Sequence, residues 1–276
     1  MRNCSEDWAV VKGVGDLGTG VAYSLLKAGF RVLATEISRP LVVRRTVSFA
    51  QAIYSGWVNV QDVKAQMVEN IEEAWALAQQ GIVPVLVDPQ AHVISQLKPV
   101  LVVDAIMAKR NTGTAQSDAP VVIGLGPGLM AGKDVHAVIE TCRGPNLGQI
   151  IYRGRAQADS KVPGAIDGHT WERLLRAPAT GIVSARVEIG NLVSKGQILA
   201  LVEDVPVKSN LDGVLRGMIQ PGLYVKEGTK IGDVDSRRDR SLCYKISDKA
   251  LKVGEGTVRA ALKLRGKINP SNQEGV

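Results

Sequence analysis

Apolar and polar positions alternate between two periods in the first part of the chain, which predicts an α/β fold. Residues 8–12 form a short β-like run, and apolar residues then recur at helical spacing over 17–26. A second β-like run follows at 30–35 and ends in Glu36. This strand–helix–strand order predicts a mostly parallel sheet whose binding site lies at the carboxyl ends of the strands.

The same alternation continues along the chain and predicts further elements. Asn70 and Glu73 form a capping box for one of the helices, and Pro40 is suited to begin another. We expect helices over 41–53, 70–81 and 91–97, and strands over 63–68, 82–87, 100–103, 121–123, 135–139 and 149–153.

A glycine-rich turn joins the first strand to the first helix. Gly13, Gly15 and Gly18 stand at G-x-G-x-x-G spacing, and Glu36 follows 23 positions after the first of them. In dinucleotide-binding folds such glycines let the backbone approach a pyrophosphate, and such an acid binds ribose. The alternative is that these glycines serve only close packing of strand on helix.

Charged residues near this turn modify the prediction. Asp16 would repel a phosphate, so we expect its side chain to cap the helix instead. Lys12 could contact a phosphate or simply be solvated. Arg44 and Arg45 lie just past Glu36, from where they could reach an anionic group or form a solvated basic face.

Asp88 and Asp104 each close a predicted strand at its carboxyl end. That position makes both residues site candidates, and Asp104 is a weak catalytic candidate. Each is also compatible with an ordinary turn or cap.

A second glycine-rich turn follows the strand at 121–123. It contains Gly126, Gly128 and Lys133, and a basic residue, Lys109, precedes it. Glycines with a nearby cation make a good anion cradle, so we expect these residues to bind the ligand. The segment lacks the Gly-Lys-Ser/Thr ending of a P-loop, so ATP hydrolysis is not indicated.

Cys142 stands beside Arg143, whose charge would favour a thiolate, and is a second weak catalytic candidate. Arg143 is itself a candidate ligand for an anion. The alternative for Cys142 is an inert thiol. The three histidines do not form a nucleophile–base pairing with it.

Four segments of the chain resemble one protein family. They are Lys-Gly-Val-Gly-Asp-Leu-Gly-Thr-Gly at 12–20, Arg-Pro-Leu-Val-Val-Arg-Arg at 39–45, Val-Asp-Ala-Ile-Met-Ala-Lys-Arg-Asn at 103–111, and Ile-Gly-Leu-Gly-Pro-Gly-Leu-Met-Ala-Gly-Lys-Asp at 123–134. The sequence resembles the accessory proteins of the selenium-dependent molybdenum hydroxylase system. The resemblance implies a role in maturation of molybdenum hydroxylases that carry a labile selenium ligand, with the hydroxylase or other maturation proteins as partners.

The region after residue 180 contains an internal duplication. The segment 181–196 recurs as 213–228, an offset of 32 residues, with glycine, aliphatic and acidic positions matched. Two such β-rich halves resemble a barrel-sandwich domain of the biotinyl/lipoyl type, although the carrier's Met-Lys-Met tip is missing. We therefore expect a structural or docking domain rather than a covalent carrier.

We predict three parts from these patterns: a Rossmann-like nucleotide-binding domain over 1–165, a duplicated barrel-sandwich domain over 166–240, and a C-terminal extension over 241–276. The extension should contain a strand at 242–246, a helix at about 255–264 and a frayed tail.

Composition narrows the function without identifying it. Only 4% of the 276 residues are aromatic, which disfavours the stacking platforms of single-strand nucleic-acid binders. The net charge of +7 is modest and distributed along the chain, which favours an anionic small ligand over nucleic acid. Three cysteines without C-x-x-C spacing argue against a disulfide framework or a zinc site, and we expect no metal. No apolar run spans a bilayer, so we expect a cytoplasmic protein, and a homo-oligomer stays open.

The leading hypothesis is a maturation factor that binds a nucleotide-bearing anion, such as NAD(P) or a molybdopterin dinucleotide. Glu36 would bind ribose, the first glycine turn the pyrophosphate, and the basic candidates further anionic groups. Two alternatives stay open: an NAD(P)-dependent oxidoreductase, for which no proton-transfer pair is evident, and a non-catalytic scaffold.

Overall fold

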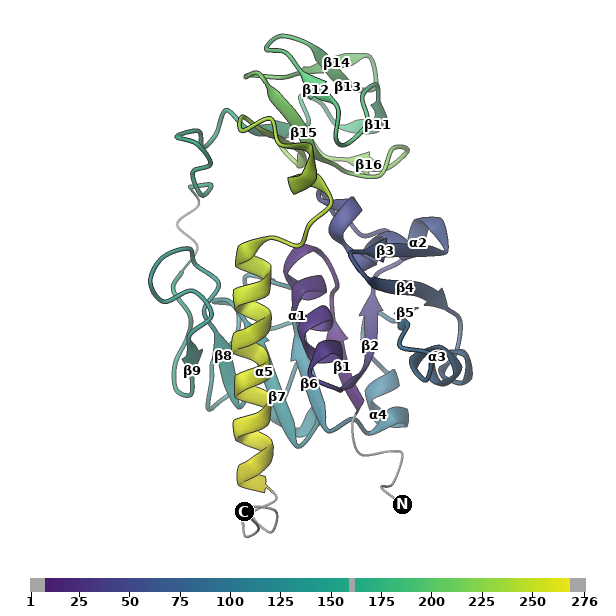
Figure 1. Ribbon diagram of the computed structural model, residues 1–276, viewed down its shortest axis with the longest axis vertical. Coiled ribbons are helices and arrows are strands. Elements are labelled where there is room, and N and C mark those ends of the chain that lie inside the picture. The colour runs from purple at the N-terminus through teal and green to yellow at the C-terminus, as the bar shows by residue number, and fades with distance from the viewer. Residues whose placement is uncertain (1–7, 159–161, 269–276) are drawn as a thin grey trace.

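The structure is a computed structural model that describes residues 8–158 and 162–268 (Figure 1). It is mixed α/β, with one large, mostly parallel sheet and two smaller antiparallel sheets. We call the part built on the large sheet the α/β region. The part from Leu174 to Asp235, which lies beyond the carboxyl ends of the central strands in Figure 1, is the duplicated β region.

The large sheet has nine strands in the order β3-β4-β5-β2-β1-β6-β7-β8-β9. The seven central strands run parallel, and β3 and β9 pair antiparallel at the two edges. The strands are β1 (Trp8–Lys12), β2 (Arg31–Glu36), β3 (Trp57–Val60), β4 (Val63–Val68), β5 (Val83–Val87), β6 (Leu101–Asp104), β7 (Val121–Leu125), β8 (Ala137–Ile139) and β9 (Ile150–Ile151).

Helices cover both faces of this sheet, as parallel strands require. One face carries α1 (Asp16–Lys27) and the long C-terminal helix α5 (Asp248–Ile268), and the other carries α3 (Ile71–Ala78) and α4 (Val93–Leu97). The two helices on the first face cross closely, because a Cβ added at Gly20 would lie 2.6 Å from the carbonyl oxygen of Ala250. Small residues at the crossing therefore let α5 complete the core of the α/β region.

The predicted strands of the α/β region are present within about two residues of their expected bounds, except that β9 is shorter. The capping box is also present in part, since the Asn70 side chain accepts a hydrogen bond from the Glu73 N–H at 2.9 Å. The antiparallel edge strand β3 was not predicted.

The helix predicted over 41–53 is wrong. The chain instead forms a loop, 3-10 turns at Arg45–Val47 and Phe49–Gln51, and the single-turn helix α2 (Ala52–Ser55). Its apolar residues serve different surroundings: Val47 and Phe49 are buried in the α/β core, whereas Val43 packs against the duplicated β region. No single helical stripe could satisfy both.

The duplicated β region consists of two four-stranded antiparallel sheets, ordered β10-β17-β15-β12 and β14-β13-β11-β16. The strands are β10 (Leu174–Arg176), β11 (Gly181–Ala185), β12 (Leu192–Val193), β13 (Ile198–Val202), β14 (Val205–Lys208), β15 (Gly213–Met218), β16 (Tyr224–Val225) and β17 (Lys230–Asp235). Strands β11, β12 and β13 correspond to β15, β16 and β17 at the 32-residue offset, and β10 corresponds to β14. The sequence repeat is thus a repeat of strands, in which each sheet combines strands of both copies.

The strand predicted over 242–246 is wrong, because a 3-10 helix occupies Arg240–Cys243. The carbonyl groups of Leu242 and Lys245 accept hydrogen bonds from the Arg44 side chain instead of from a neighbouring strand. The helix predicted at 255–264 lies inside the longer α5. Among the described residues, no helix is long and apolar enough to cross a membrane.

Candidate functional site

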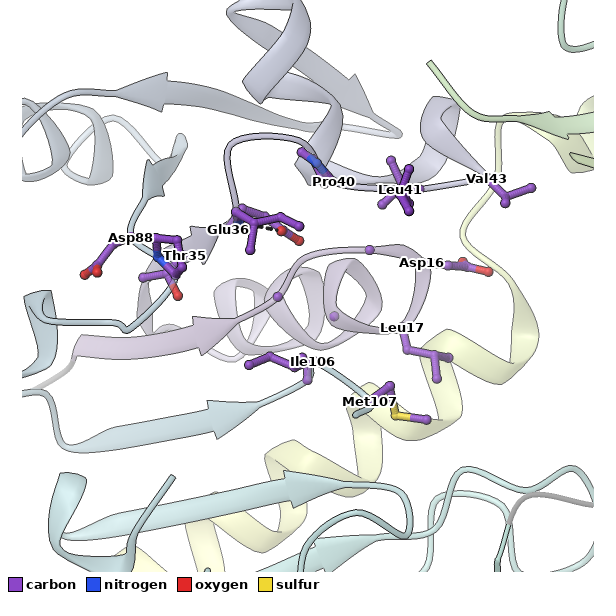
Figure 2. Close-up of a pocket in the computed structure, with 17 residues that line it drawn as sticks. Asp16, Leu17, Thr35, Glu36, Pro40, Leu41, Val43, Asp88, Ile106 and Met107 are labelled. Carbon is purple, nitrogen blue, oxygen red and sulfur yellow. Dashed lines mark hydrogen bonds between the residues drawn. The ribbon is translucent and has the colours of Figure 1, made fainter. Parts of the chain in front are cut away.

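A cleft of about 430 Å³ opens at the carboxyl ends of β1, β2, β5 and β6 (Figure 2). Its floor includes the first glycine turn, and the loop containing Pro40, Leu41 and Val43 lies on its other side. Glu36 and Asp88 lie toward one end, and Asp16 and Met107 toward the other. We call this the glycine-turn cleft.

Glycine occupies the three positions of this turn for different structural reasons. Gly13 has a φ of +81°, which favours glycine, and a Cβ at Gly18 would lie 2.0 Å from the Gly13 carbonyl oxygen. Gly15 has an ordinary φ of −63°, and its Cβ would meet only the Val42 Cγ1 at 3.6 Å. Gly13 and Gly18 are therefore explained by the fold, whereas Gly15 leaves open space in the cleft that the fold does not need.

Glu36 is held at the rim of the turn by two backbone hydrogen bonds. Val14 N–H donates to its Oε1 at 2.8 Å, and Ile37 N–H donates to its Oε2 at 2.9 Å. Burial raises the pKa of Glu36, and the two N–H donors oppose that rise. Each carboxylate oxygen keeps capacity for another donor, such as a ribose hydroxyl.

The two aspartates at strand ends have structural partners. Asp88 accepts a hydrogen bond from Val93 N–H at 2.8 Å, so it caps α4 while still lining the cleft. Asp104 is buried and accepts hydrogen bonds from the Thr114 hydroxyl at 2.6 Å and from a backbone N–H. Lys12 donates to the same hydroxyl at 2.6 Å. Neither expectation for Lys12 holds, since it is buried in this network rather than solvated or facing the turn.

Asp16 does not cap α1 through its side chain. It forms an ion pair with Arg44 at 3.0 Å, and the same guanidinium donates to the carbonyls of Leu242 and Lys245. Arg45 donates from Nε to the Met218 carbonyl at 3.0 Å. The two arginines thus fasten the loop to the C-terminal segment and to the duplicated β region instead of lining the glycine-turn cleft.

The second glycine turn is closed by packing. Gly126 has a φ of +71°, and a Cβ at Gly128 would lie 2.0 Å from the Ala108 carbonyl oxygen. Arg155 donates to the carbonyls of Pro127 and Gly128 at 3.2 and 3.1 Å. Lys133 is exposed, and it lines neither the glycine-turn cleft nor the second cavity that adjoins this cleft. Pro127 of this turn does line that second cavity together with Asp16 of the first turn, but Lys133 lies apart from that cavity.

A second cavity of about 620 Å³ adjoins the glycine-turn cleft, and Asp16, Val43 and Met107 line both. We call it the basic cavity, because seven Lys or Arg side chains and two Asp side chains line it. Lys109 and Arg143 are among them, and the half-buried Cys142 also faces it. With Arg44, four of the predicted site residues thus meet here.

The contacts of Cys142 and Arg143 restrict their roles. Cys142 N–H donates to the buried Glu140 at 2.7 Å, which positions the backbone beside the cavity. Arg143 forms a two-point ion pair with Asp248 at 2.9 and 3.1 Å. Hydrogen bonding from that guanidinium lowers the pKa of Asp248 to about 2.

Sequence reasoning missed three cations of the basic cavity, which are Arg216 and Lys230 of the duplicated β region and Arg173 immediately before it. A signal was present in the repeat. At the 32-residue offset these positions correspond to Ser184, Ile198 and Val205, so the charges occur in only one of two equivalent sites.

No protein-family model matches this chain. The chain is 47% identical over 255 residues to the uncharacterized protein YqeB of Escherichia coli K12, a match that covers 92% of this chain and 47% of YqeB. The chain thus spans about half the length of this curated relative.

Two solved structures show weaker similarity. The tRNA N6-threonylcarbamoyladenosine dehydratase TcdA of E. coli, in complex with ATP, is 11% identical at a TM-score of 0.36, over 97% of this chain and 89% of that one. The product-bound ectoine utilization protein EutE (DoeB) of Ruegeria pomeroyi is 12% identical at a TM-score of 0.26, over 83% and 85%. Likenesses at these TM-scores carry no argument about function.

Proposed function

We propose that this protein binds a nucleotide-bearing anionic ligand in the glycine-turn cleft and acts as an accessory factor in the maturation of a molybdenum hydroxylase. The α/β region would then be Rossmann-like and the duplicated β region a barrel-sandwich domain. A molybdopterin dinucleotide would fit both the nucleotide-binding cleft and the maturation role. NAD(P) is the alternative dinucleotide.

Gly15 carries the binding half of the proposal. Gly15 is the N-cap residue of α1, where several small residues are accepted, and its Cβ would meet only one atom, so close packing gives no reason for glycine. In a G-x-G-x-x-G turn, the second glycine lets a pyrophosphate approach the backbone. The open space at Gly15 therefore fits a ligand phosphate, and the N–H groups at the start of α1 would face it.

The chemistry around Gly15 supports the same ligand. Glu36 lies at the carboxyl end of β2 with free acceptor capacity for a ribose, and the loop from Pro40 to Val43 supplies an apolar wall. Asp16 does not oppose a phosphate at full strength, because its charge is paired with Arg44.

The maturation half rests on the resemblance of four sequence segments to the selenium-dependent molybdenum hydroxylase accessory proteins. The partner would be the hydroxylase or another maturation protein. In a host that carries both genes, deletion of the gene for this protein should lower the hydroxylase activity and its selenium content. Wild-type protein should restore both, and Gly15→Ala should not.

The binding half is tested by calorimetry with ADP, CDP, GDP, UDP, NAD⁺ and NADP⁺ as probes. We expect at least one probe to bind the wild type, and Gly15→Ala to weaken that binding at least about tenfold, because a methyl group would displace the phosphate from the backbone. Gly15→Ala should stay folded at 25 °C and lose only about 1 kcal/mol of stability, the cost of alanine at the N-cap of α1. Absence of binding by every probe, or equal binding by Gly15→Ala, would overturn the proposal.

Gly29→Ala is the matched control. Gly29 lies in the turn between α1 and β2, and a Cβ there would meet nothing within 4 Å. Its φ of +90° makes alanine strained at this position. The substitution should therefore lower stability moderately and leave the affinity for the probe unchanged. A loss of affinity in both variants would indicate a general effect of destabilisation.

A further inference from the structure

The basic cavity holds more positive charge than its neighbouring carboxylates neutralise. Asp16 pairs with Arg44, and Asp233 pairs with Arg173. Lys230 lies 4.0 Å from the same Asp233 carboxylate, and Lys109 forms no ion pair among the described residues. The mutual repulsion of cations grouped in this way favours an anion in the space that they share.

Arg216 is the most constrained of these cations. Its residue is 8% exposed, its Nη1 lies 3.3 Å from Asp235, and its Nε is buried without a hydrogen-bond partner. The Asp235 carboxylate is already engaged by Arg237 at 2.6 and 2.9 Å. Burial, followed by the nearby charge of Arg44, lowers the pKa of Arg216. The buried Arg216 guanidinium thus shares its one carboxylate with Arg237 and keeps an Nε–H that no acceptor satisfies.

The repeat provides an internal comparison for this charge. Arg216 and Lys230 correspond to Ser184 and Ile198 of the first copy, both of which are exposed. In both of these pairs of equivalent positions, only the residue that lines the basic cavity is a cation. The fold of the repeat does not require them, because the first copy forms the same strands without them.

We propose that the basic cavity binds a second, phosphate-type oxyanion of the ligand, with Arg216 and Lys230 of the duplicated β region as its ligands. This inference rests on the proposed function, because the nucleotide would occupy the glycine-turn cleft. The two cavities share Asp16, Val43 and Met107, whose side chains lie at one end of that cleft in Figure 2, so one ligand can extend from one cavity into the other.

The arrangement gives the duplicated β region a binding role. Loop residue Val43 packs against it, and a Cβ added at Gly217 would lie 2.7 Å from the Val43 Cγ1. An anion held by Arg216 and Lys230 would therefore bridge the β region and the glycine turn through one continuous ligand. Both regions would contribute to its affinity.

The test compares a nucleoside diphosphate with the tetraphosphate of the same nucleoside on the full chain. The diphosphate reaches the glycine turn, and the two added phosphates extend toward the basic cavity. We expect the tetraphosphate to bind wild type at least about tenfold more tightly, because its added phosphates would accept charge-assisted hydrogen bonds from Arg216 and Lys230. The double variant Arg216→Gln/Lys230→Gln should lose that gain and bind the diphosphate as wild type does.

The control variant Lys208→Gln/Lys226→Gln removes two charges from exposed positions of the same β region outside the basic cavity, and should keep the gain. If the double variant fails to fold by circular dichroism, the single variant Lys230→Gln replaces it, because this side chain is 38% exposed. It should lose about threefold or more of the tetraphosphate affinity.

The outcomes separate the two proposals. If the diphosphate binds but the tetraphosphate binds no more tightly, or if the double variant keeps the gain, the second anion site is wrong and the proposed function stands. If no nucleotide binds, the proposed function fails, and inorganic triphosphate becomes the probe. Triphosphate binding that is lost in the double variant would support the anion site alone, and no binding would overturn it.

Discussion

The two glycine-rich turns have similar sequences and different surroundings. Both follow a central parallel strand, and both place glycines where a Cβ would lie 2.0 Å from a backbone oxygen, at Gly18 and at Gly128. After β1 the turn borders an open cleft, and after β7 Arg155 covers the turn carbonyls. A glycine-rich turn is therefore a means of close packing first, and it becomes a binding element only where one glycine is left without a packing role.

The largest expected effect concerns Gly18 and Gly128, which have the same packing role in the two turns. Gly18→Ala and Gly128→Ala should each lower the free energy of unfolding by about 3 kcal/mol or more, because the methyl group would overlap a carbonyl oxygen and move the backbone. Urea denaturation measures both. If either variant unfolds within about 1 kcal/mol of wild type, packing does not explain that glycine.

The second prediction tests the cover of the closed turn. Arg155→Ala removes two hydrogen bonds to the carbonyls of Pro127 and Gly128 and should lower the free energy of unfolding by about 1 kcal/mol. Amide exchange near Gly128 should become faster. The neighbouring exposed Arg153→Ala serves as the control and should change neither quantity. Equal effects of the two substitutions would mean that Arg155 acts only through its charge.

The strands could be predicted from the sequence, because buried parallel strands are short apolar runs bounded by turn residues. Residues 83–87 and 101–104 are examples. The loop over 41–53 could not, since its apolar residues divide between two cores that the local pattern does not reveal. The site was predicted in part: Gly15 and Glu36 were found by motif spacing, whereas the tertiary arrangement alone joins Lys109 to Arg216 and Lys230.

The roles of charged residues were hardest to predict, because their partners are distant in sequence. Arg44 is bound by Asp16 and by carbonyls about 200 positions away, and Lys12 is bound by Thr114. Neither partner follows from local spacing. The signal available without a structure was a cation at one of two matched repeat positions, as at Arg216 opposite Ser184 and Lys230 opposite Ile198.

The third prediction concerns pH and the open turn. Because burial raises the pKa of Glu36, the folded protein keeps this proton to higher pH than the unfolded chain does. Its stabilising contribution is fully present below the unfolded carboxyl pKa of about 4.3 and is lost as the pH rises through the raised value. The stability of wild type relative to Glu36→Gln should therefore fall across that interval.

Urea denaturation at a series of pH values measures this difference, and Glu72→Gln, at an exposed position of α3, controls for loss of one charge. A difference that stays flat or grows with pH would contradict the buried carboxyl at the rim of the open turn.

The smallest expected effect separates the two turns as anion sites. Lys133→Ala should leave the free energy of unfolding within about 0.5 kcal/mol of wild type. It should also leave the affinity for a nucleoside tetraphosphate within about twofold, because Lys133 lines neither cavity. Lys109→Ala, at an exposed lysine of the basic cavity, should weaken tetraphosphate binding several-fold, mainly by slowing association. Calorimetry on both variants decides the matter. If Lys133→Ala is as damaging as Lys109→Ala, the turn after β7 binds anions after all, and its packed glycines do not exclude a ligand.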